Sequence, residues 1–375
     1  MTYKAFQDFY HEESIKHLLV HKHNDCLISP PFATEQCKDY SDIMVIDKDL
    51  NVRYIHLGLP LATSKFNACV SIGESVWFIP YGIWDDFNIV VQIKDFVPIY
   101  HYINKTGRGQ FYSVASDGNT AFSFPLGYEE TSYGIYIKDD TVCTIDFDKK
   151  EHTKLHMGTV FCNGKYWSAP RSDSPGYTSL MSFDGTQLQS YTIDVKDPSI
   201  TRKYTDITVV GNTLYAIPYG ETKGMTEVLE FDTETNSYTL HDLDIPDFAK
   251  KFNVSVLVGH VIVALPYGDE YENDSNWGLV YNTLTKEYHT FDIGLSFGGK
   301  YRYRCGISYK GNAVFFPTGT PTCPILVIDT QGNIIKKQEV TNSLLGRPVL
   351  FNGKIVTMAY NFDTKENYIF TLDLE

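Results

Sequence analysis

Residues 71–82, SIGESVWFIPYG, join a glycine turn to an apolar strand that ends in Pro-Tyr-Gly. The same arrangement returns at 210–220, VGNTLYAIPYG, and at 258–268, VGHVIVALPYG. Less regular copies keep the turn and the strand but vary the end: SDGNTAFSFPLG (116–127), KGNAVFFPTG (310–319), CNGKYWSAPRS (162–172), HNDCLISPPF (23–32) and FNGKIVTMAYN (351–361). A segment that recurs in this way predicts a repeat architecture.

The proline near the end of each copy gives the period of the repeat. The prolines stand at 30, 80, 125, 170, 218, 266 and 317, and Ala359 takes this position in the eighth copy. Neighbouring markers are 42 to 51 residues apart, so eight units of about 47 residues account for the chain.

Each unit contains the signals of two hairpins, and therefore of four strands. The turn before the Pro-x-Gly strand is a pair of the kind that two-residue hairpins require for positive φ. These pairs are Asp117-Gly118, Asn163-Gly164, Gly211-Asn212, Gly311-Asn312 and Asn352-Gly353. A second hairpin follows a loop of variable length, and its turn begins at a residue type that bonds its own backbone; these residues are Asp47, Asp148, Asp232, Asn282 and Asp329.

A four-stranded unit repeated at this period predicts the blades of a β-propeller, an all-β fold that leaves few exposed sheet edges. We expect a single domain over residues 1–375 with eight four-stranded blades. The eighth unit stops after its third strand, at NYIFTLDLE, so residues 2–10 are predicted to form the outer strand of that last blade. The alternatives are seven blades with one poorly formed unit, an open solenoid, or two sandwiches.

The repeat resembles the kelch and galactose-oxidase central-domain type of propeller over the whole chain. The shared features are the turn-and-strand element GNTLYAIPYG and the D-x-x-T-x-x-Y hairpin from Asp232 to Tyr238. The chain departs from the kelch pattern because Pro-x-Gly replaces the Gly-Gly doublet and no Trp follows the hairpin turn. The resemblance implies an architecture rather than an activity, since propellers serve unrelated functions.

Composition and charge exclude several classes of protein. With 43% hydrophobic and 14% aromatic residues the chain has ample material for a core, and a net charge of −14 argues against general binding to nucleic acid or anionic membranes. The seven cysteines show no C-x-x-C pair, and the N-terminus shows no signal-peptide pattern. We therefore expect reduced thiols and a cytoplasmic protein, or a virion protein if its source is a virus.

Linear signatures of catalysis, cofactors and metals are scarce. The sequence contains no G-x-S-x-G, H-E-x-x-H, P-loop or G-x-G-x-x-G helix opening, so no cofactor is expected. The His21/His23 and His152/His156 spacings could support a metal, but ordinary strand residues are the favoured interpretation. The acidic loop at 269–274 lacks the pattern of a calcium loop and is interpreted as solvated.

The loops between the second and third strands of the blades are acidic and aromatic, which indicates the working face. We predict that this face binds a partner through the aromatic residues Trp84, Tyr128 and Trp277, the neighbouring loop residues Asp85 and Arg171, and the Pro-Tyr-Gly residues Tyr219 and Tyr267.

A cation followed by an aromatic residue recurs 15 residues before the proline of four units. The cations are Lys65, Lys203, Lys251 and Arg302. Their shared register implies a shared location, where they could attract a carboxylate or phosphate. The alternative is that they neutralise the acidic loops while the aromatics pack between blades.

Two functions follow from these features. The leading hypothesis is a non-catalytic scaffold that holds a protein or glycan partner on the loop face, for example as a component of a virion or tail assembly. The alternative is a carbohydrate-active lyase or epimerase whose basic residues grip an acidic sugar. An enzyme should bring a His, Tyr or Glu together with the cations in a deep pocket, whereas a scaffold should show paired charges.

Overall fold

The computed structural model describes residues 2–5, 14–82, 86–105, 111–127, 133–147, 156–267, 276–295, 302–317, 323–340 and 343–374. In these ranges the chain forms antiparallel strands, and the one helix is a short 3-10 turn, Glu35–Cys37. No helix in the described part is long and apolar enough to cross a membrane. The chain divides into two compact units, residues 1–149 with 343–375 and residues 150–342. The predicted single domain therefore stays a prediction.

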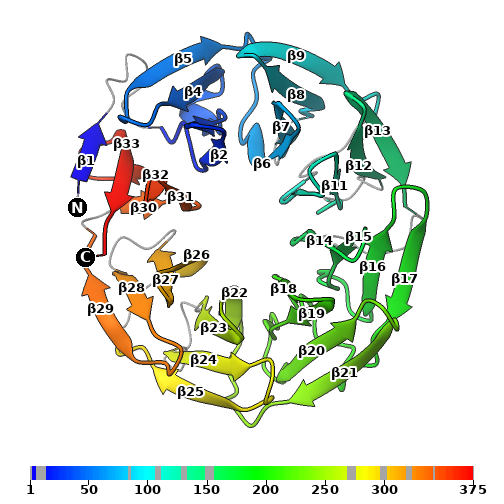
Figure 1. Ribbon diagram of the computed structural model, residues 1–375. Coiled ribbons are helices and arrows are strands. Elements are labelled where there is room, and N and C mark those ends of the chain that lie inside the picture. The colour runs from blue at the N-terminus through cyan, green and yellow to red at the C-terminus, as the bar shows by residue number, and fades with distance from the viewer. Residues whose placement is uncertain are drawn as a thin grey trace. The chain divides into compact units, whose positions relative to one another are not determined.

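The first unit contains four blades, coloured blue to cyan and red in Figure 1. Blade 1 consists of β2 (His21–His23), β3 (Cys26–Ser29), β4 (Asp42–Ile46) and β5 (Val52–His56). Blade 2 consists of β6 (Phe66–Ile72), β7 (Ser75–Pro80), β8 (Ile89–Lys94) and β9 (Val97–Tyr102). Blade 3 consists of β10 (Ala115–Ser116), β11 (Thr120–Ser123), β12 (Tyr133–Lys138) and β13 (Thr141–Asp146). Blade 8 consists of β30 (Ser343–Leu345), β31 (Val349–Phe351), β32 (Lys354–Asn361), β33 (Glu366–Leu372) and β1 (Thr2–Ala5).

The second unit contains the other four blades. Blade 4 consists of β14 (Val160–Cys162), β15 (Lys165–Ser168), β16 (Ser179–Phe183) and β17 (Leu188–Thr192). Blade 5 consists of β18 (Thr208–Val210), β19 (Thr213–Ala216), β20 (Glu227–Asp232) and β21 (Ser237–Asp242). Blade 6 consists of β22 (Phe252–Val258), β23 (Val261–Pro266), β24 (Trp277–Asn282) and β25 (Tyr288–Asp292). Blade 7 consists of β26 (Tyr303–Tyr309), β27 (Asn312–Pro317), β28 (Ile325–Ile328) and β29 (Ile334–Gln338).

The eight sheets confirm the predicted fold class, an eight-bladed β-propeller, because seven blades are four-stranded meanders in chain order and the eighth, built from β30 to β33, is completed by β1. The turn chemistry is also confirmed: the side chains of Asp47, Asp232, Asn282 and Asp329 accept backbone N–H groups two to four residues further on. Asp148 lies outside the described residues. Two turns differ from the prediction. Lys310 and Gly311, rather than Gly311 and Asn312, adopt positive φ, and Tyr309 pairs with Asn312. Asp117 and Gly118 stand in a longer connection between the paired Ser116 and Ala121, where Gly118 but not Asp117 has positive φ.

The N-terminal strand completes the last blade as predicted. β1 pairs antiparallel with β33, with Thr2 opposite Thr371 and Ala5 opposite Tyr368. The rest of the predicted strand, residues 6–10, lies outside the described residues. A strand from the start of the chain therefore covers the edge of the sheet formed by its end.

Apolar cores lie between consecutive blades of each unit. In the second unit one cluster joins Tyr215 and Val228 of blade 5 to Ile262 and Leu279 of blade 6. Clusters of the same kind lie between blades 4 and 5, 6 and 7, 8 and 1, 1 and 2, and 2 and 3. The packing is close enough that a Cβ on Gly306 would lie 2.6 Å from the Val256 side chain. Each blade is therefore stable only against its neighbours.

Backbone hydrogen bonds connect the loop ends of the blades in series. In the second unit the N–H of Lys251 donates to the carbonyl of Tyr219 at 2.8 Å, and the carbonyl of Lys251 accepts from the N–H of Tyr267 at 2.9 Å. The carbonyl of Tyr267 in turn accepts from the N–H of Arg302 at 2.8 Å. The first unit repeats the pattern, because Lys65 donates to Phe32 and accepts from Tyr81, each at 2.8 Å. The Pro-x-Gly segment of one blade thus holds the first strand of the next.

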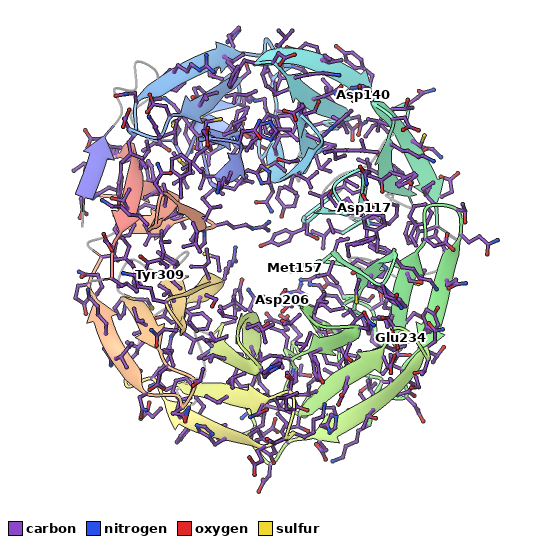
Figure 2. The ribbon with its side chains drawn as sticks, in the orientation of Figure 1. Asp117, Asp140, Met157, Asp206, Glu234 and Tyr309 are labelled. Carbon is purple, nitrogen blue, oxygen red and sulfur yellow. The ribbon has the colours of Figure 1, made fainter. Side chains whose placement is uncertain are left out.

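Side chains also link neighbouring blades. Asp206, labelled in Figure 2, accepts from the backbone N–H of Ser255 at 3.3 Å and from its hydroxyl at 3.2 Å, which joins blade 5 to blade 6. Asp140, in the same figure, accepts from Gln92 at 2.7 Å and so joins blade 3 to blade 2. These links fix the register between blades, which apolar packing alone specifies weakly.

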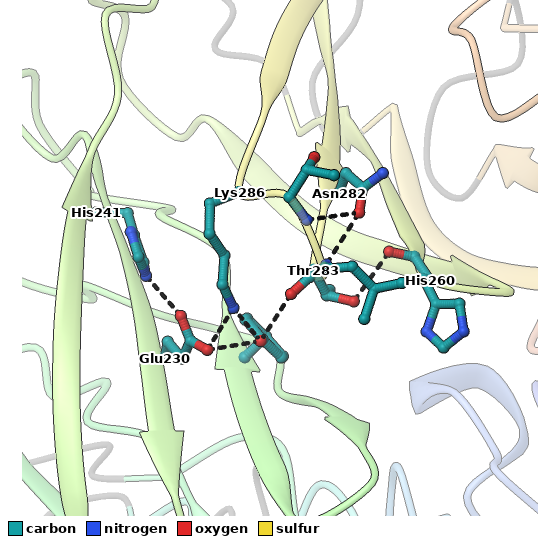
Figure 3. A network of polar contacts seen from close by, with 9 residues as sticks. Glu230, His241, His260, Asn282, Thr283 and Lys286 are labelled. Carbon is teal, nitrogen blue, oxygen red and sulfur yellow. Dashed lines mark hydrogen bonds and ion pairs between the residues drawn. The ribbon is translucent and has the colours of Figure 1, made fainter.

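A half-buried carboxylate links blades 5 and 6 (Figure 3). Glu230 on β20 accepts from the hydroxyl of Tyr215 at 2.8 Å, from Nε2 of His241 at 2.6 Å and from the ammonium group of Lys286 in the blade 6 turn. Burial by itself raises the pKa of Glu230, but these hydrogen bonds more than offset it, and the net pKa lies below its usual value. The ionised carboxylate is therefore the form that holds the two blades together.

Replacing Glu230 by Gln is expected to lower the free energy of unfolding at pH 7 by about 1–3 kcal/mol, since hydrogen bonds to a charged group are lost. Because the folded-state pKa is depressed, the carboxylate's contribution is full above its usual pKa near 4.5 and is lost as the pH falls through the folded value. Urea unfolding at pH 7 and pH 3.5 should show a smaller pH difference for the variant than for wild type. The exposed Glu287→Gln control should stay within about 0.5 kcal/mol of wild type, and an equal pH difference in Glu230→Gln and wild type would contradict this assignment.

Deleting residues 1–5 removes the outer strand of blade 8 and should lower the free energy of unfolding by about 2–4 kcal/mol, since each backbone hydrogen bond contributes about 0.5–1.5 kcal/mol net. The exposed edge of β33 should also promote aggregation, measurable by light scattering. A synthetic peptide of residues 1–13, added in trans, should restore both properties. Unchanged stability of the truncated chain would show that β1 is dispensable.

Candidate binding site

The three lysines of the recurring cation–aromatic pattern occupy equivalent buried positions at the loop ends of their blades. Lys65, Lys203 and Lys251 each expose no more than 1% of their surface. Each ammonium group donates to the backbone carbonyl three residues earlier, at 2.7 Å to Ala62, 2.6 Å to Ile200 and 2.5 Å to Phe248. The residue before each lysine, Ser64, Arg202 or Lys250, has a φ of 49–51°, which turns the loop back onto the ammonium group.

Additional acceptors from the same loops complete each contact. Lys203 donates to the carbonyls of Tyr177 and Pro198 at 3.0 Å each, and Lys251 donates to the carboxylate of Asp247 at 2.9 Å. Arg302, at the matching position of blade 7, donates to the side-chain oxygen of Asn276 at 2.6 Å. Burial lowers the pKa of Lys203 to about 8, so its ammonium form still holds the loop at neutral pH. The sequence predicts either that these cations attract an anion or that they neutralise acidic loops. The contacts seen here are with groups of the surrounding loops, mostly backbone carbonyls.

The positions directly after the Pro-x-Gly prolines form a row across blades 4, 5 and 6. Arg171 follows Pro170, Tyr219 follows Pro218 and Tyr267 follows Pro266. The buried rings of Tyr219 and Tyr267 pack edge to face with their centroids 5.8 Å apart. Arg304 of β26 stacks on Tyr267, 5.1 Å from its centroid, and donates to its hydroxyl. The structure therefore brings together three of the residues predicted for binding, and we name them the Arg-Tyr-Tyr row.

Arg171 differs from the other members of the row because its charge is poorly compensated. Its side chain is only 11% exposed, and the nearest carboxylate contact is Nη1 to Oδ1 of Asp173 at 3.6 Å. Nε and Nη1 are enclosed and have no hydrogen-bond acceptor among the described residues. Burial, together with the neighbouring charge of Arg202, lowers the pKa of the Arg171 guanidinium. Buried donors without acceptors are rare in native proteins and cost free energy.

Paired charges surround the row on the loop side. Arg202 donates to both carboxylate oxygens of Asp173, with Nη2 to Oδ2 at 3.0 Å, and through Nη1 to Oε2 of Glu221 at 2.9 Å. Lys250 lies 3.5 Å from the other oxygen of Glu221. Because Arg202 takes up both oxygens of Asp173, that carboxylate is poorly placed to serve Arg171 as well.

Trp277, also predicted to bind a partner, does not join the row. Trp277 is the first residue of β24 and is half-buried against the core between blades 5 and 6, so it contributes to packing. Trp84, Asp85 and Tyr128 lie outside the described residues.

A separate pocket of about 550 Å³ lies at the opposite, turn end of blades 1 and 2. Its floor contains Ile28 and Val45, and its rim carries Asp25, Glu74 and Arg53. The guanidinium of Arg53 stacks 3.8 Å from the centroid of the Phe96 ring. The pocket therefore lies away from Lys65, which sits at the loop end of blade 2.

The histidines considered as metal ligands have other contacts. His21 and His23 both bond the hydroxyl of Ser71, at 2.8 and 2.9 Å, and burial lowers the pKa of His21 to about 4. His156 lies 3.2 Å from the hydroxyl of Tyr177, while His152 lies outside the described residues. In the described ranges no group of three His, Cys, Asp or Glu side chains could hold a metal ion.

The comparisons with known proteins identify the class to which this fold belongs. No protein-family model and no curated protein matches the chain. Among solved structures it is similar to the β-propeller domain of Cps50 (Swd1) from Myceliophteria thermophila, with a TM-score of 0.51 and 10% identity over 96% of this chain and 99% of that one. It is also similar to the WD40 β-propeller domain of Doa1, with a TM-score of 0.49 and 12% identity over 83% of this chain and 94% of that one. The chain is therefore a β-propeller protein, and identities at this level concern the fold alone.

Sequence reasoning missed the residues that surround Arg171. Asp173 and Glu221 stand in loops that the sequence shows only as acidic, and Arg304 lies within a strand two residues beyond the recurring cation. The shared position after the proline is a signal that could have grouped Arg171 with Tyr219 and Tyr267. No signal in the sequence indicates that Arg171 has no acceptor.

Replacing Lys203 by Met should lower the free energy of unfolding by about 2–4 kcal/mol, because three backbone carbonyls lose their buried donor. The matched control is Lys196→Met in the same loop, where the side chain is 68% exposed and pairs with Asp242, so the loss of stability should be much smaller than for Lys203→Met. Chemical denaturation of both variants provides the test. Equal stability of the two variants would remove the structural role assigned to Lys203.

Proposed function

We propose that this protein is a non-catalytic scaffold that binds a protein partner through the loop end of blades 4 to 6. The observation that carries the proposal is the pairing of charges at this end, where Arg202 joins Asp173 to Glu221 and Lys250 joins the same network. A pre-formed network of this kind presents a rigid polar rim around aromatic and arginine residues, the types that dominate binding energy in protein interfaces.

The geometry of the lysines supports a scaffold over an enzyme acting on an acidic sugar. Such an enzyme would use Lys65, Lys203 and Lys251 to grip the substrate carboxylate, but each of these ammonium groups is bound to its own loop. The carboxylate that contacts Lys251, Asp247 at 2.9 Å, belongs to the same loop as the lysine.

Finer features of the proposal rest on the sequence. The D-x-x-T-x-x-Y hairpin at 232–238 supports a kelch-type relation, and the absence of a recognisable targeting pattern supports a cytoplasmic protein or a virion component. A glycan is the alternative partner, since tyrosine and arginine also suit sugar hydroxyls.

A pull-down from the native source tests the scaffold and its face together. The variant Pro175→Arg/Lys223→Glu alters two exposed positions in the loops of blades 4 and 5 and should lose a partner that wild type retains. The matched control is Leu284→Arg in the turn of blade 6, a 65% exposed position at the other end of the strands, and it should retain the partner. Loss of the partner in Leu284→Arg alone would place the binding face at the turn end of the blades instead.

If neither wild type nor the variants retain a partner, and wild type instead turns over an acidic sugar, the scaffold proposal fails. Thermal unfolding of all variants should give midpoints within a few degrees of wild type, since the substituted positions are exposed. This check separates a lost interface from a lost fold.

A further inference from the structure

Arg171 carries hydrogen-bond donors that have no acceptor among the described residues. Its Nε and Nη1 atoms are enclosed without a partner in the described part of the chain. Tyr219, the next member of the Arg-Tyr-Tyr row, is buried close enough to influence the Arg171 guanidinium, and its hydroxyl is a further hydrogen-bond donor. Arg202 lies close enough to influence both groups, and its own donors are taken up by Asp173 and Glu221.

The chemistry of these groups specifies what is missing. A guanidinium can only donate, and a buried guanidinium without acceptors keeps the full cost of its lost hydration. The missing group must therefore supply acceptor oxygens and negative charge together. A carboxylate has this combination, and its two oxygens match the planar geometry of arginine. The side chain is 11% exposed and stands at the loop end of blade 4.

The charge of the whole chain limits the form in which the carboxylate arrives. A net charge of −14 repels a long acidic tract at a distance, so recognition has to come from the local site. One carboxylate among uncharged neighbours avoids most of this repulsion. The rings of Tyr219 and Tyr267 pack beside Arg171, and Arg304 stacks on Tyr267. These rings offer aromatic surface to the residues that flank the carboxylate in the partner.

We propose that Arg171 and Tyr219 bind a single carboxylate group presented by a Glu or Asp side chain of the partner protein. This inference rests on the proposed scaffold function and names the group that the scaffold recognises. Arg171 supplies the charge and Tyr219 a second donor. The network of Asp173, Arg202 and Glu221 holds the surrounding loops in place.

The test uses two short peptides that differ in one residue, acetyl-Ala-Gly-Glu-Gly-Ala-amide and its Gln counterpart, with glucuronate as a third probe. Saturation-transfer NMR titrations on the full chain measure each affinity. The Glu peptide should bind wild type at least tenfold more tightly than the Gln peptide. Arg171→Met should abolish the difference, and Arg171→Lys should reduce it because the charge remains without the planar fork.

The matched control is Arg53→Met, which removes an exposed arginine from the turn end of blade 1 and should keep the tenfold preference. Folding provides a second readout. Without ligand, Arg171→Met should unfold at a midpoint equal to or above that of wild type, because an uncompensated buried charge is replaced by an apolar side chain of similar length. A lower midpoint would mean that Arg171 is satisfied within the fold, and it would overturn the proposal.

The remaining outcomes separate this inference from the scaffold function. Equal affinity for the Glu and Gln peptides overturns the carboxylate site, while a partner captured by both wild type and Arg171→Met leaves the scaffold function standing without it. Binding of glucuronate alone, dependent on Arg171, overturns the protein source of the carboxylate and favours an acidic sugar. A preference for the Glu peptide that is lost only in Arg171→Met supports the proposal.

Discussion

The structure depends on one backbone contact. The residues after three of the Pro-x-Gly prolines, Tyr81, Tyr219 and Tyr267, form backbone hydrogen bonds with the cation-bearing residues that precede first strands. Within blade 5 and on to blade 7, Tyr219 and Tyr267 alternate in this way with Lys251 and Arg302 at 2.8–2.9 Å. Proline supplies the bend and glycine the positive φ, as at Gly220 with a φ of 64°. Since a single blade cannot bury its faces alone, this contact sets the position of each blade on the next.

The same contact explains why the repeated lysines are buried. A chain that turns back at a left-handed residue leaves several carbonyls pointing inward, and these need a donor. Lys203 provides three donors from one side chain and so serves three carbonyls at 2.6–3.0 Å. The lysines in repeat register thus hold loops closed, and their spacing follows that of the repeat.

Departures from the repeat are more informative about function than the repeat itself. Arg171 stands where blades 5 and 6 place a tyrosine, and its guanidinium finds neither the carbonyls that the lysines use nor a full ion pair. Buried polar groups left without partners are uncommon where structure is the only requirement. The proposed site is therefore a position where the repeat places arginine instead of tyrosine and where buried donors have no acceptor among the described residues.

The sequence by itself determined the eight blades, their four strands and the completion of the last blade by Thr2–Ala5, because glycine turns and strand periodicity are local properties of the chain. It also determined the turn residues, apart from the shift to Lys310-Gly311 and the longer turn at Asp117-Gly118. Only the tertiary structure decided which acceptors surround Lys65, Lys203, Lys251 and Arg171. Those acceptors come from segments up to 27 residues away, as from Lys38 to Lys65, and the approach of such segments depends on how loops fold back. For this reason the lysines bond the carbonyls of loops, while Nε and Nη1 of Arg171 have no hydrogen-bond acceptor in the described part of the chain.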